Sequence, residues 1–404
     1  MGLKDNRYYN GVPTRRTTRC CSAVALAALL FVFAAARSAA RGDAGPQPFW
    51  PVRTLWTLAL NTEVTQRPAF DEARAYFPIE GKRLAAYDIT SGKQLWIVDA
   101  RPLYAPVAGS GFVFFVEDEA LVAIKAEDGS RAWTSPVDGA LAVAPVWTDG
   151  WLLLATKSGT IVAVRASDGH EIWRHDVGVG VHDEPAVSGT RIFLPLDNGR
   201  VIALQIETGS PLWERRLGGA PGAILALDER LFVGATDNFF YALKTDTGEV
   251  DWRWRTGAVA VGLPAVDKDR VYFAALDNTA RALNRSNGVQ QWIQLLKLRP
   301  MAGALRVGAS VIVYGLVPPM RAMNTSDGKG GGDVSVPGQL IAVAPPQALG
   351  ADEALPLLIV TTRDVASGDT VTLLTRSVEP AASPLAALPN PLNAIPTLAN
   401  STGL

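Results

Sequence analysis

Cysteine is almost absent from this chain, and histidine is scarce. The only two cysteines, Cys20 and Cys21, are adjacent and lie near the N-terminus. The rest of the sequence therefore has no disulfide framework, and no C-x-x-C-H site for haem attachment occurs. The three histidines, His170, His175 and His182, have no partner at the spacing of metal ligands. These absences argue against a zinc or haem centre.

Net charge and catalytic motifs are also lacking. The formal net charge is −1, which gives no support for binding to nucleic acid or to an anionic membrane surface. No G-x-S-x-G, Walker loop or H-E-x-x-H motif occurs, so no hydrolase or nucleotide-binding signature is present. Glycine (37) and proline (27) are plentiful, and 48% of the residues are hydrophobic. This composition fits a turn-rich all-β fold with a substantial core.

The N-terminus has the pattern of an export signal. Basic residues precede the uncharged stretch Cys20–Ala36, and small residues follow it. That stretch is shorter than the roughly 20 residues that a spanning helix needs. We expect residues 1–40 to be a cleaved signal peptide, with an uncleaved anchor as the alternative, and 41–49 to be a linker. The predicted location is the periplasm or the exterior, and the cysteines lie too early for lipidation.

Repeats dominate the middle of the chain. Successive tryptophans of one motif lie 37, 40, 40, 39 and 40 residues apart, which is the period of a radially repeated β-sheet. The motif is A-x5-G-x3-W, and its six copies are Ala86/Gly92/Trp96, Ala123/Gly129/Trp133, Ala163/Gly169/Trp173, Ala203/Gly209/Trp213, Ala242/Gly248/Trp252 and Ala282/Gly288/Trp292. Proline and glycine punctuation divides each unit into four short strands. We expect the glycine to form the turn before the fourth strand and the alanine to mark a close approach of sheets. The tryptophan would fill the space between sheets and cap the turn.

Half-copies of the motif flank the six complete ones. Trp56 precedes Trp96 by 40 residues, and Ala342 repeats the alanine half without a following tryptophan. The predicted fold is an all-β propeller of four-stranded antiparallel blades over 50–377. An N-terminal strand would join the C-terminal blade and close the ring, because closure leaves no unpaired edge. Six whole blades and one composite blade give seven.

The C-terminal third of the chain is less regular. Residues 324–338 resemble a glycine-rich insertion in the composite blade. Two apolar runs, 355–362 and 370–377, indicate strands that either complete that blade or begin an eighth. Residues 378–404, rich in proline and alanine, resemble a disordered tail.

Three strings carry a family resemblance: AAYDITSGKQLW (85–96), VAIKAEDGSRAW (122–133) and IALQIETGSPLW (202–213). They resemble the repeat of PQQ-type, quinoprotein-like β-propellers. That family includes quinoprotein alcohol dehydrogenases and non-catalytic scaffolds such as the outer-membrane assembly subunit BamB. The enzymes commonly hold pyrroloquinoline quinone beside a disulfide of adjacent cysteines, and the only adjacent pair here lies in the signal segment.

The resemblance implies three candidate functions. We expect a non-enzymatic, monomeric scaffold without cofactor that binds a periplasmic or outer-membrane protein and does not span the membrane after signal cleavage. The first alternative is a PQQ- and calcium-dependent dehydrogenase of alcohols or sugars, and the second is a carbohydrate-binding propeller. The densest ionisable cluster is His182-Asp183-Glu184. It precedes a first strand, so we expect it at the mouth of the central channel, either as a binding site or as an ordinary solvated loop.

Overall fold

The computed structural model describes residues 46–227, 229–344, 356–364 and 368–377. These residues form 32 strands and no helix, which confirms the prediction of an all-β protein. Within this part of the chain, no helix is long and apolar enough to cross a membrane. The predicted signal segment and tail, 1–40 and 378–404, lie outside the described residues.

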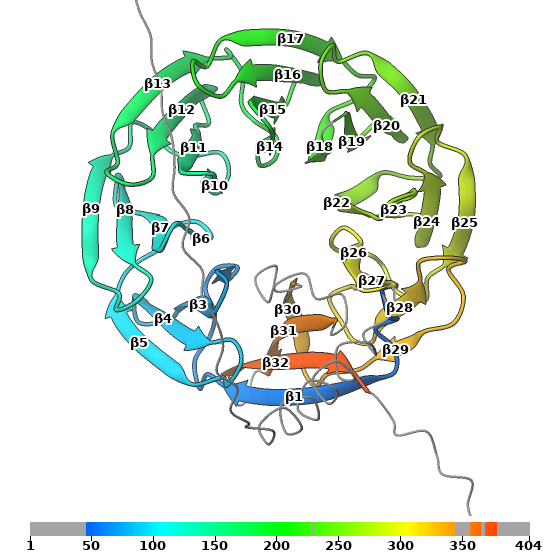
Figure 1. Cartoon of the computed structure of the whole chain (residues 1–404), viewed down its shortest axis with the longest axis horizontal. Coiled ribbons are helices and arrows are strands. Elements are labelled where there is room, and N and C mark those ends of the chain that lie inside the picture. Colours follow the sequence, from blue (N-terminus) through cyan, green and yellow to red (C-terminus); the bar gives the residue numbers. More distant parts are fainter. Residues whose placement is uncertain (1–45, 228, 345–355, 365–367, 378–404) are drawn as a thin grey trace, which may run out of the picture. The chain divides into compact units, whose positions relative to one another are not determined.

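The strands form eight four-stranded antiparallel sheets, here called blades 1 to 8, which follow one another around a ring (Figure 1). In each of the first seven blades the strands run in chain order from the innermost to the outermost. The predicted four-stranded blades are therefore confirmed, but the predicted number of seven is wrong.

The first four blades have the same plan, with a short inner strand and longer middle and outer strands. Their strands are, for blade 1, β2 (Ala69–Phe70), β3 (Arg74–Ile79), β4 (Arg83–Asp88) and β5 (Gln94–Asp99); for blade 2, β6 (Val107–Gly109), β7 (Phe112–Glu117), β8 (Ala120–Lys125) and β9 (Arg131–Pro136); for blade 3, β10 (Val146–Thr148), β11 (Trp151–Ala155), β12 (Thr160–Arg165) and β13 (Glu171–Asp176); for blade 4, β14 (Ala186–Ser188), β15 (Arg191–Pro195), β16 (Arg200–Gln205) and β17 (Pro211–Arg216).

The last four blades include the closure of the ring. Their strands are, for blade 5, β18 (Pro221–Ala226), β19 (Arg230–Ala235), β20 (Phe239–Lys244) and β21 (Val250–Arg255); for blade 6, β22 (Ala260–Val266), β23 (Arg270–Ala275), β24 (Thr279–Asn284) and β25 (Gln290–Leu295); for blade 7, β26 (Leu305–Val307), β27 (Ser310–Val313), β28 (Met320–Asn324) and β29 (Gly332–Val334); for blade 8, β30 (Gln339–Ala344), β31 (Leu357–Asp364), β32 (Gly368–Arg376) and β1 (Val52–Ala59).

Burial along a blade explains why its strands differ in composition. The middle strands carry continuous apolar runs, and four successive residues of β15 and of β16 are buried. Such strands have a neighbouring blade on each face, so both faces must be apolar. The outer strand β17 alternates between exposed and half-buried residues, because only one of its faces packs on a neighbour. The core is thus divided into clusters between adjacent blades, such as the one that joins Phe114 to Leu152.

Blade 7 corrects the prediction that residues 324–338 are an insertion. Its third strand, β28, carries Ala322, and Gly328 follows at the spacing of the motif. The position of the tryptophan, however, is occupied by Gly332, at the start of the short outer strand β29. The repeat is therefore complete in backbone but lacks its indole, and a search for A-x5-G-x3-W cannot find it.

Blade 8 corrects the role assigned to Ala342. This residue lies on the inner strand β30, not on a third strand, and its partner is Thr361 of β31. The two predicted C-terminal strands are β31 and β32, which complete an eighth sheet. The N-terminal strand β1 joins that sheet as its outer strand, and Trp56 lies opposite Leu373 of β32.

A buried carboxylate of this sheet binds the segment that follows the N-terminal strand. The Asp369 side chain has no solvent exposure. Its carboxylate accepts hydrogen bonds from the Arg363 guanidinium (Nε to Oδ1, 2.9 Å) and from the backbone N–H of Val64 (2.7 Å). Hydrogen bonding to Asp369 raises the pKa of Arg363. Because Asp369 is a fully buried charge, removal of its partner Arg363 would be costly.

Candidate functional site

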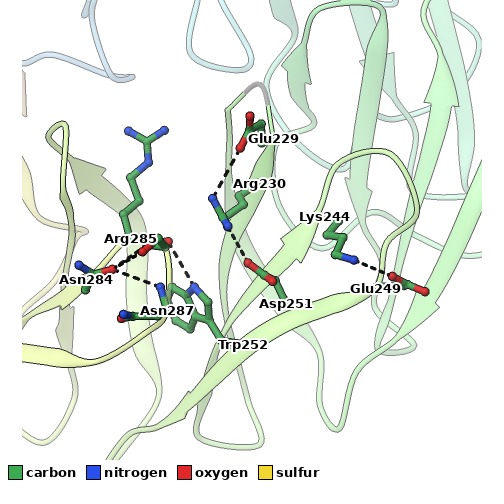
Figure 2. A network of polar contacts seen from close by, with 10 residues as sticks. Glu229, Arg230, Lys244, Glu249, Asp251, Trp252, Asn284, Arg285 and Asn287 are labelled. Atoms are coloured by element: carbon green, nitrogen blue, oxygen red, sulfur yellow. Dashed lines mark hydrogen bonds and ion pairs between the residues drawn. The ribbon is translucent and has the colours of Figure 1, made fainter.

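The tryptophan of each motif connects one blade to the next. In blade 3 the indole Nε1 of Trp173 donates to the backbone carbonyl of Ile206 in blade 4 (2.6 Å). The acceptor is always three residues after the motif alanine of the next blade. The other pairs are Trp56 with Ile89, Trp96 with Ala126, Trp133 with Ala166, Trp213 with Thr245, Trp252 with Arg285 and Trp292 with Thr325. Figure 2 shows this bond from Trp252 to Arg285, beside the turn that contains Asn284 and Asn287.

The motif glycine of the next blade packs against the face of that indole. Gly248 has a φ of +67°, and a Cβ built on it would lie 2.4 Å from Cε3 of Trp213 in the preceding blade. A side chain there would therefore meet both backbone strain and a ring. Gly328 of blade 7 has the same relation to Trp292, at 2.7 Å.

The other motif glycines also have positive φ, and each contacts the tryptophan of the preceding blade. These pairs, with the distance from a built Cβ to the nearest indole atom, are Gly92 with Trp56 (3.4 Å), Gly129 with Trp96 (3.0 Å), Gly169 with Trp133 (2.6 Å), Gly209 with Trp173 (2.5 Å) and Gly288 with Trp252 (2.6 Å). Gly92 differs from the rest, because 3.4 Å is an ordinary van der Waals distance. At Gly129 the nearest atom is Cγ1 of Val98, at 2.7 Å, rather than the indole.

These contacts add to the role that the sequence suggested for the glycines Gly92, Gly129, Gly169, Gly209, Gly248 and Gly288. The sequence predicted that they form the turn before the fourth strand of their own blade, and their positive φ values fit that turn. The structure shows that each turn also receives an indole from the blade before it. The turn that a tryptophan caps therefore belongs to the next blade, about 33 residues further along the chain. This contact between blades becomes visible only when the sheets are arranged in the closed ring.

The motif alanine lies directly opposite the tryptophan of its own blade, as Ala203 does with Trp213. A β-bulge follows this pair, because the register shifts between Ala203 and Leu204. All six motif alanines are fully buried: Ala86, Ala123, Ala163, Ala203, Ala242 and Ala282. Alanine, glycine and tryptophan thus form one interlocking unit between neighbouring sheets.

The interface between blades 7 and 8 uses a different indole. A Cβ built on Gly332 would lie 2.5 Å from ring atoms of Trp50, which belongs to the N-terminal segment. The preceding residue, Phe49, is completely buried, and its N–H donates to Oγ of Ser310 (2.8 Å). The end of the predicted linker 41–49 therefore contributes to the core. The 40-residue spacing from Trp292 to Gly332 was the signal that could have located this site.

The three residues predicted for the channel mouth, His182, Asp183 and Glu184, each have a different contact. Nδ1 of His182 lies 2.8 Å from Oδ1 of Asp197 in the neighbouring hairpin tip. Asp183 accepts from the backbone N–H of Glu184 (2.8 Å), and the Glu184 carboxylate pairs with the guanidinium of Arg67. The structure therefore does not bring the three predicted residues together into one cluster.

Sequence reasoning missed Arg67, which binds Glu184, and Tyr314, whose hydroxyl is affected by the charge of Arg67. Arg67 precedes β2 of blade 1, whereas Glu184 precedes β14 of blade 4, so their ion pair links blades that are not neighbours. Burial raises the pKa of the Tyr314 hydroxyl, and the positive charge of Arg67 opposes that rise. With side-chain exposures of 66% and 40%, the Arg67–Glu184 pair is solvated and contributes little stability.

The described residues offer no obvious site for the calcium of a quinoprotein. Within 46–227, 229–344, 356–364 and 368–377, no group of three or more His, Cys, Asp or Glu side chains could hold a metal ion. Calcium requires six to eight oxygen ligands, several of them carboxylates. The adjacent cysteines Cys20 and Cys21 lie outside the described residues.

Comparison with known proteins places the repeat in a family. A family model described as outer membrane protein assembly factor BamB matches residues 53–143, 117–228 and 197–335. The chain belongs to this family of PQQ-type β-propellers. No curated protein matches the sequence at a significant level.

Solved structures share the fold at low sequence identity. BamB from Moraxella catarrhalis is 17% identical, with a TM-score of 0.61 over 80% of this chain and 99% of that chain. The computationally designed Ika8 protein is 15% identical, with a TM-score of 0.64 over 80% and 99%. Quinohemoprotein alcohol dehydrogenase from Comamonas testosteroni is 10% identical, with a TM-score of 0.61 over 83% and 81%. At these identities the likeness concerns the fold alone, which serves scaffold and enzyme alike.

Proposed function

We propose that this protein is an exported, non-enzymatic scaffold that binds a protein of the bacterial envelope. The observation that carries the proposal is the family match, which spans residues 53–335 under the description of an outer-membrane protein assembly factor. The compact ring supports it, because a rigid propeller presents loops at the ends of its blades to a partner. The N-terminal basic and apolar pattern supports a periplasmic location.

A pull-down from crosslinked envelope extract tests this function. The full chain carrying a C-terminal affinity tag should recover one or a few envelope proteins in amounts comparable to its own. An unrelated periplasmic propeller with the same tag serves as the control. Recovery of no protein beyond that control would contradict the scaffold function.

The second candidate is a PQQ- and calcium-dependent dehydrogenase, which the fold shared with quinohemoprotein alcohol dehydrogenases favours. Quinone and calcium are added to the purified protein, and the absorbance spectrum and dye reduction with alcohols or sugars are followed. An absorption band of bound quinone at one quinone per protein, together with dye reduction that depends on substrate, would show that the protein is an enzyme and would contradict the scaffold function.

A further inference from the structure

An exposed group of apolar side chains lies at one end of blades 6 and 7. Leu263, Met301, Leu316 and Val317 are exposed to 49, 56, 43 and 68% of their full areas. We call these four residues the blade-7 patch. Single exposed apolar residues need no explanation, but a contiguous group marks a site of interaction.

Backbone contacts show that the three segments of the patch lie against one another. The N–H of Met301 donates to the carbonyl of Tyr314 (3.1 Å), which joins the connector after β25 to the hairpin tip after β27. A Cβ built on Gly303 would lie 1.8 Å from the carbonyl oxygen of Leu263. The segment at the start of blade 6 is therefore in contact with the same connector. The patch is one surface rather than three separate loops.

The other blades show that the fold does not require apolar residues here. The tip between the second and third strands of blade 7 reads Leu316-Val317-Pro318-Pro319. The corresponding tips of blades 3 to 6 are polar and read Lys157-Ser158-Gly159, Asp197-Asn198-Gly199, Asp237-Asn238 and Asp277-Asn278. Blade 7 thus departs from its own repeats at a position where stability favours turn-forming polar residues.

Two cations border the patch. Lys297 and Arg299, in the connector between β25 and β26, are both exposed. Neither makes an ion pair with any residue of the described part of the chain, whereas Arg281 in the same blade is paired with Asp277 (2.9 Å). An apolar centre with free positive charges at its rim is complementary to a segment that combines apolar side chains with carboxylates.

We propose that the blade-7 patch docks a protein segment that combines apolar residues with acidic ones. This proposal rests on the scaffold function and specifies the site and the chemistry of its partner. An anionic lipid surface is a poorer fit, because the same end of the ring carries exposed acids on other loops. Asp118 and Glu119, for example, form the tip between the second and third strands of blade 2, and both are exposed. A flat membrane would meet these charges, but a narrow peptide would not.

Site-specific photocrosslinking tests the proposal in the full-length chain. Val317 is replaced by p-benzoylphenylalanine, and Leu212, which is 44% exposed on the outer strand of blade 4, is replaced in the matched control. Both proteins are irradiated in envelope extract, and the crosslinked peptide is sequenced by mass spectrometry. We expect a crosslink from position 317 to a segment with apolar and acidic residues, and none to that segment from position 212.

A synthetic peptide of the identified segment then gives the affinity by fluorescence anisotropy. Val317→Glu and the double variant Lys297→Glu/Arg299→Glu should each weaken binding at least tenfold, and Leu212→Ser should leave it unchanged. Binding should also weaken as salt is raised, less so in the double variant. Circular dichroism and melting temperature serve as the check that each variant is folded.

Three outcomes overturn the inference. The first is a crosslink from 317 to a segment without acidic residues, and the second is an affinity that both variants leave unchanged. The third is binding to vesicles of phosphatidylglycerol that Val317→Glu abolishes, which would make the patch a membrane contact. If the pull-down still recovers envelope proteins, the scaffold function survives each of these results. If the pull-down recovers no envelope protein, the scaffold function itself is contradicted, whatever the results at the blade-7 patch.

Discussion

At the scale of single residues, the indole of the motif tryptophan has two roles. Its ring fills the space between blades, and its N–H satisfies a carbonyl at the end of a neighbouring strand, as Trp213 does with Thr245 (2.9 Å). Among the side chains that carry a hydrogen-bond donor on an aromatic ring system, tryptophan has the largest apolar area. This combination explains why one residue type recurs at a fixed position in six consecutive units.

Replacement of Trp213 by alanine should cost about 3–5 kcal/mol, because it leaves a cavity between blades 4 and 5 and removes the hydrogen bond. Urea unfolding followed by circular dichroism measures the loss. Trp213→Phe, which keeps much of the ring but not the donor, should recover part of it. An unchanged unfolding midpoint in the alanine variant would rule out the packing role.

The motif glycine allows strain and packing to be separated. Gly248 and Gly178 have similar φ values, +67° and +73°, but a Cβ would meet Trp213 only at Gly248, and nothing lies within 4 Å at Gly178. We expect Gly178→Ala to cost about 1 kcal/mol from the positive φ alone. Gly248→Ala should cost clearly more, because the indole must also move. Equal losses in thermal unfolding would show that the contact with Trp213 contributes nothing.

At the scale of elements, the turn between β22 and β23 is organised by one carboxylate. Asp267 accepts from the backbone N–H groups of Asp269 (2.8 Å) and Arg270 (2.7 Å) and from the Tyr272 hydroxyl. Burial opposes ionisation of Asp267, but these hydrogen bonds outweigh it, and the pKa of the carboxyl lies below its usual value. The turn in blade 1 repeats the arrangement with Asp71, Arg74 and Tyr76.

This lowered pKa has a consequence for acid stability. A carboxyl whose pKa is lower in the folded state stabilises the protein above its unfolded pKa of about 3.9, and the contribution disappears as the pH falls through the folded value. Asp267→Asn should therefore destabilise the protein at pH 7, by about 1.5–3 kcal/mol for charged hydrogen bonds. The difference from wild type should shrink below about pH 4. Melting temperatures between pH 7 and pH 3 measure it, and a difference independent of pH would contradict the assignment.

The same element scale shows what the sequence could and could not predict. Strand order and the turns of six blades follow from local signals, since glycine at positive φ and alternating burial are properties of a few adjacent residues. Blade 7 was missed because Gly332 replaces the indole, which Trp50 supplies from the other end of the chain. Blade 8 was misassigned because nothing local distinguishes an inner strand from a third strand around Ala342.

The candidate site shows the same limit. The place of Glu184 before a first strand can be read from the sequence, but its partner Arg67 is 117 residues away. Only the closed ring brings these two residues together, so no local pattern predicts the pair. The Asp-Asn sequences at the tips of blades 4, 5 and 6, by contrast, are local turn signals in themselves.

At the scale of the whole molecule, the N-terminal segment completes two blades. Trp50 fills the position vacated at Gly332, and β1 pairs with β32 immediately afterwards. Trp50→Ala should therefore lower the melting temperature by an amount comparable to Trp213→Ala, although the residue lies outside every repeat. Thermal unfolding of both variants gives the comparison. A negligible effect of Trp50→Ala would mean that blade 7 is stable without an indole.

The closure itself can be tested by a disulfide, because the chain has no cysteines other than Cys20 and Cys21. Ala59 of β1 lies opposite Thr370 of β32. In a Cys20→Ser/Cys21→Ser background, Ala59→Cys with Thr370→Cys should oxidise readily, since paired residues of antiparallel strands have Cα atoms about 4.5–5.5 Å apart. Ala59→Cys with Arg376→Cys is the control, because six residues of extended strand, about 20 Å, separate its second site from Thr370.

The crosslink should also stabilise the protein. It joins the two ends of the propeller, so it restricts the unfolded chain over a loop of more than 300 residues, for which the chain-entropy model gives about 6 kcal/mol. The melting temperature of the oxidised variant should exceed that of its reduced form, and dithiothreitol should abolish the difference. Formation of the control disulfide instead, or of neither, would show that β1 does not pair with β32 in this register.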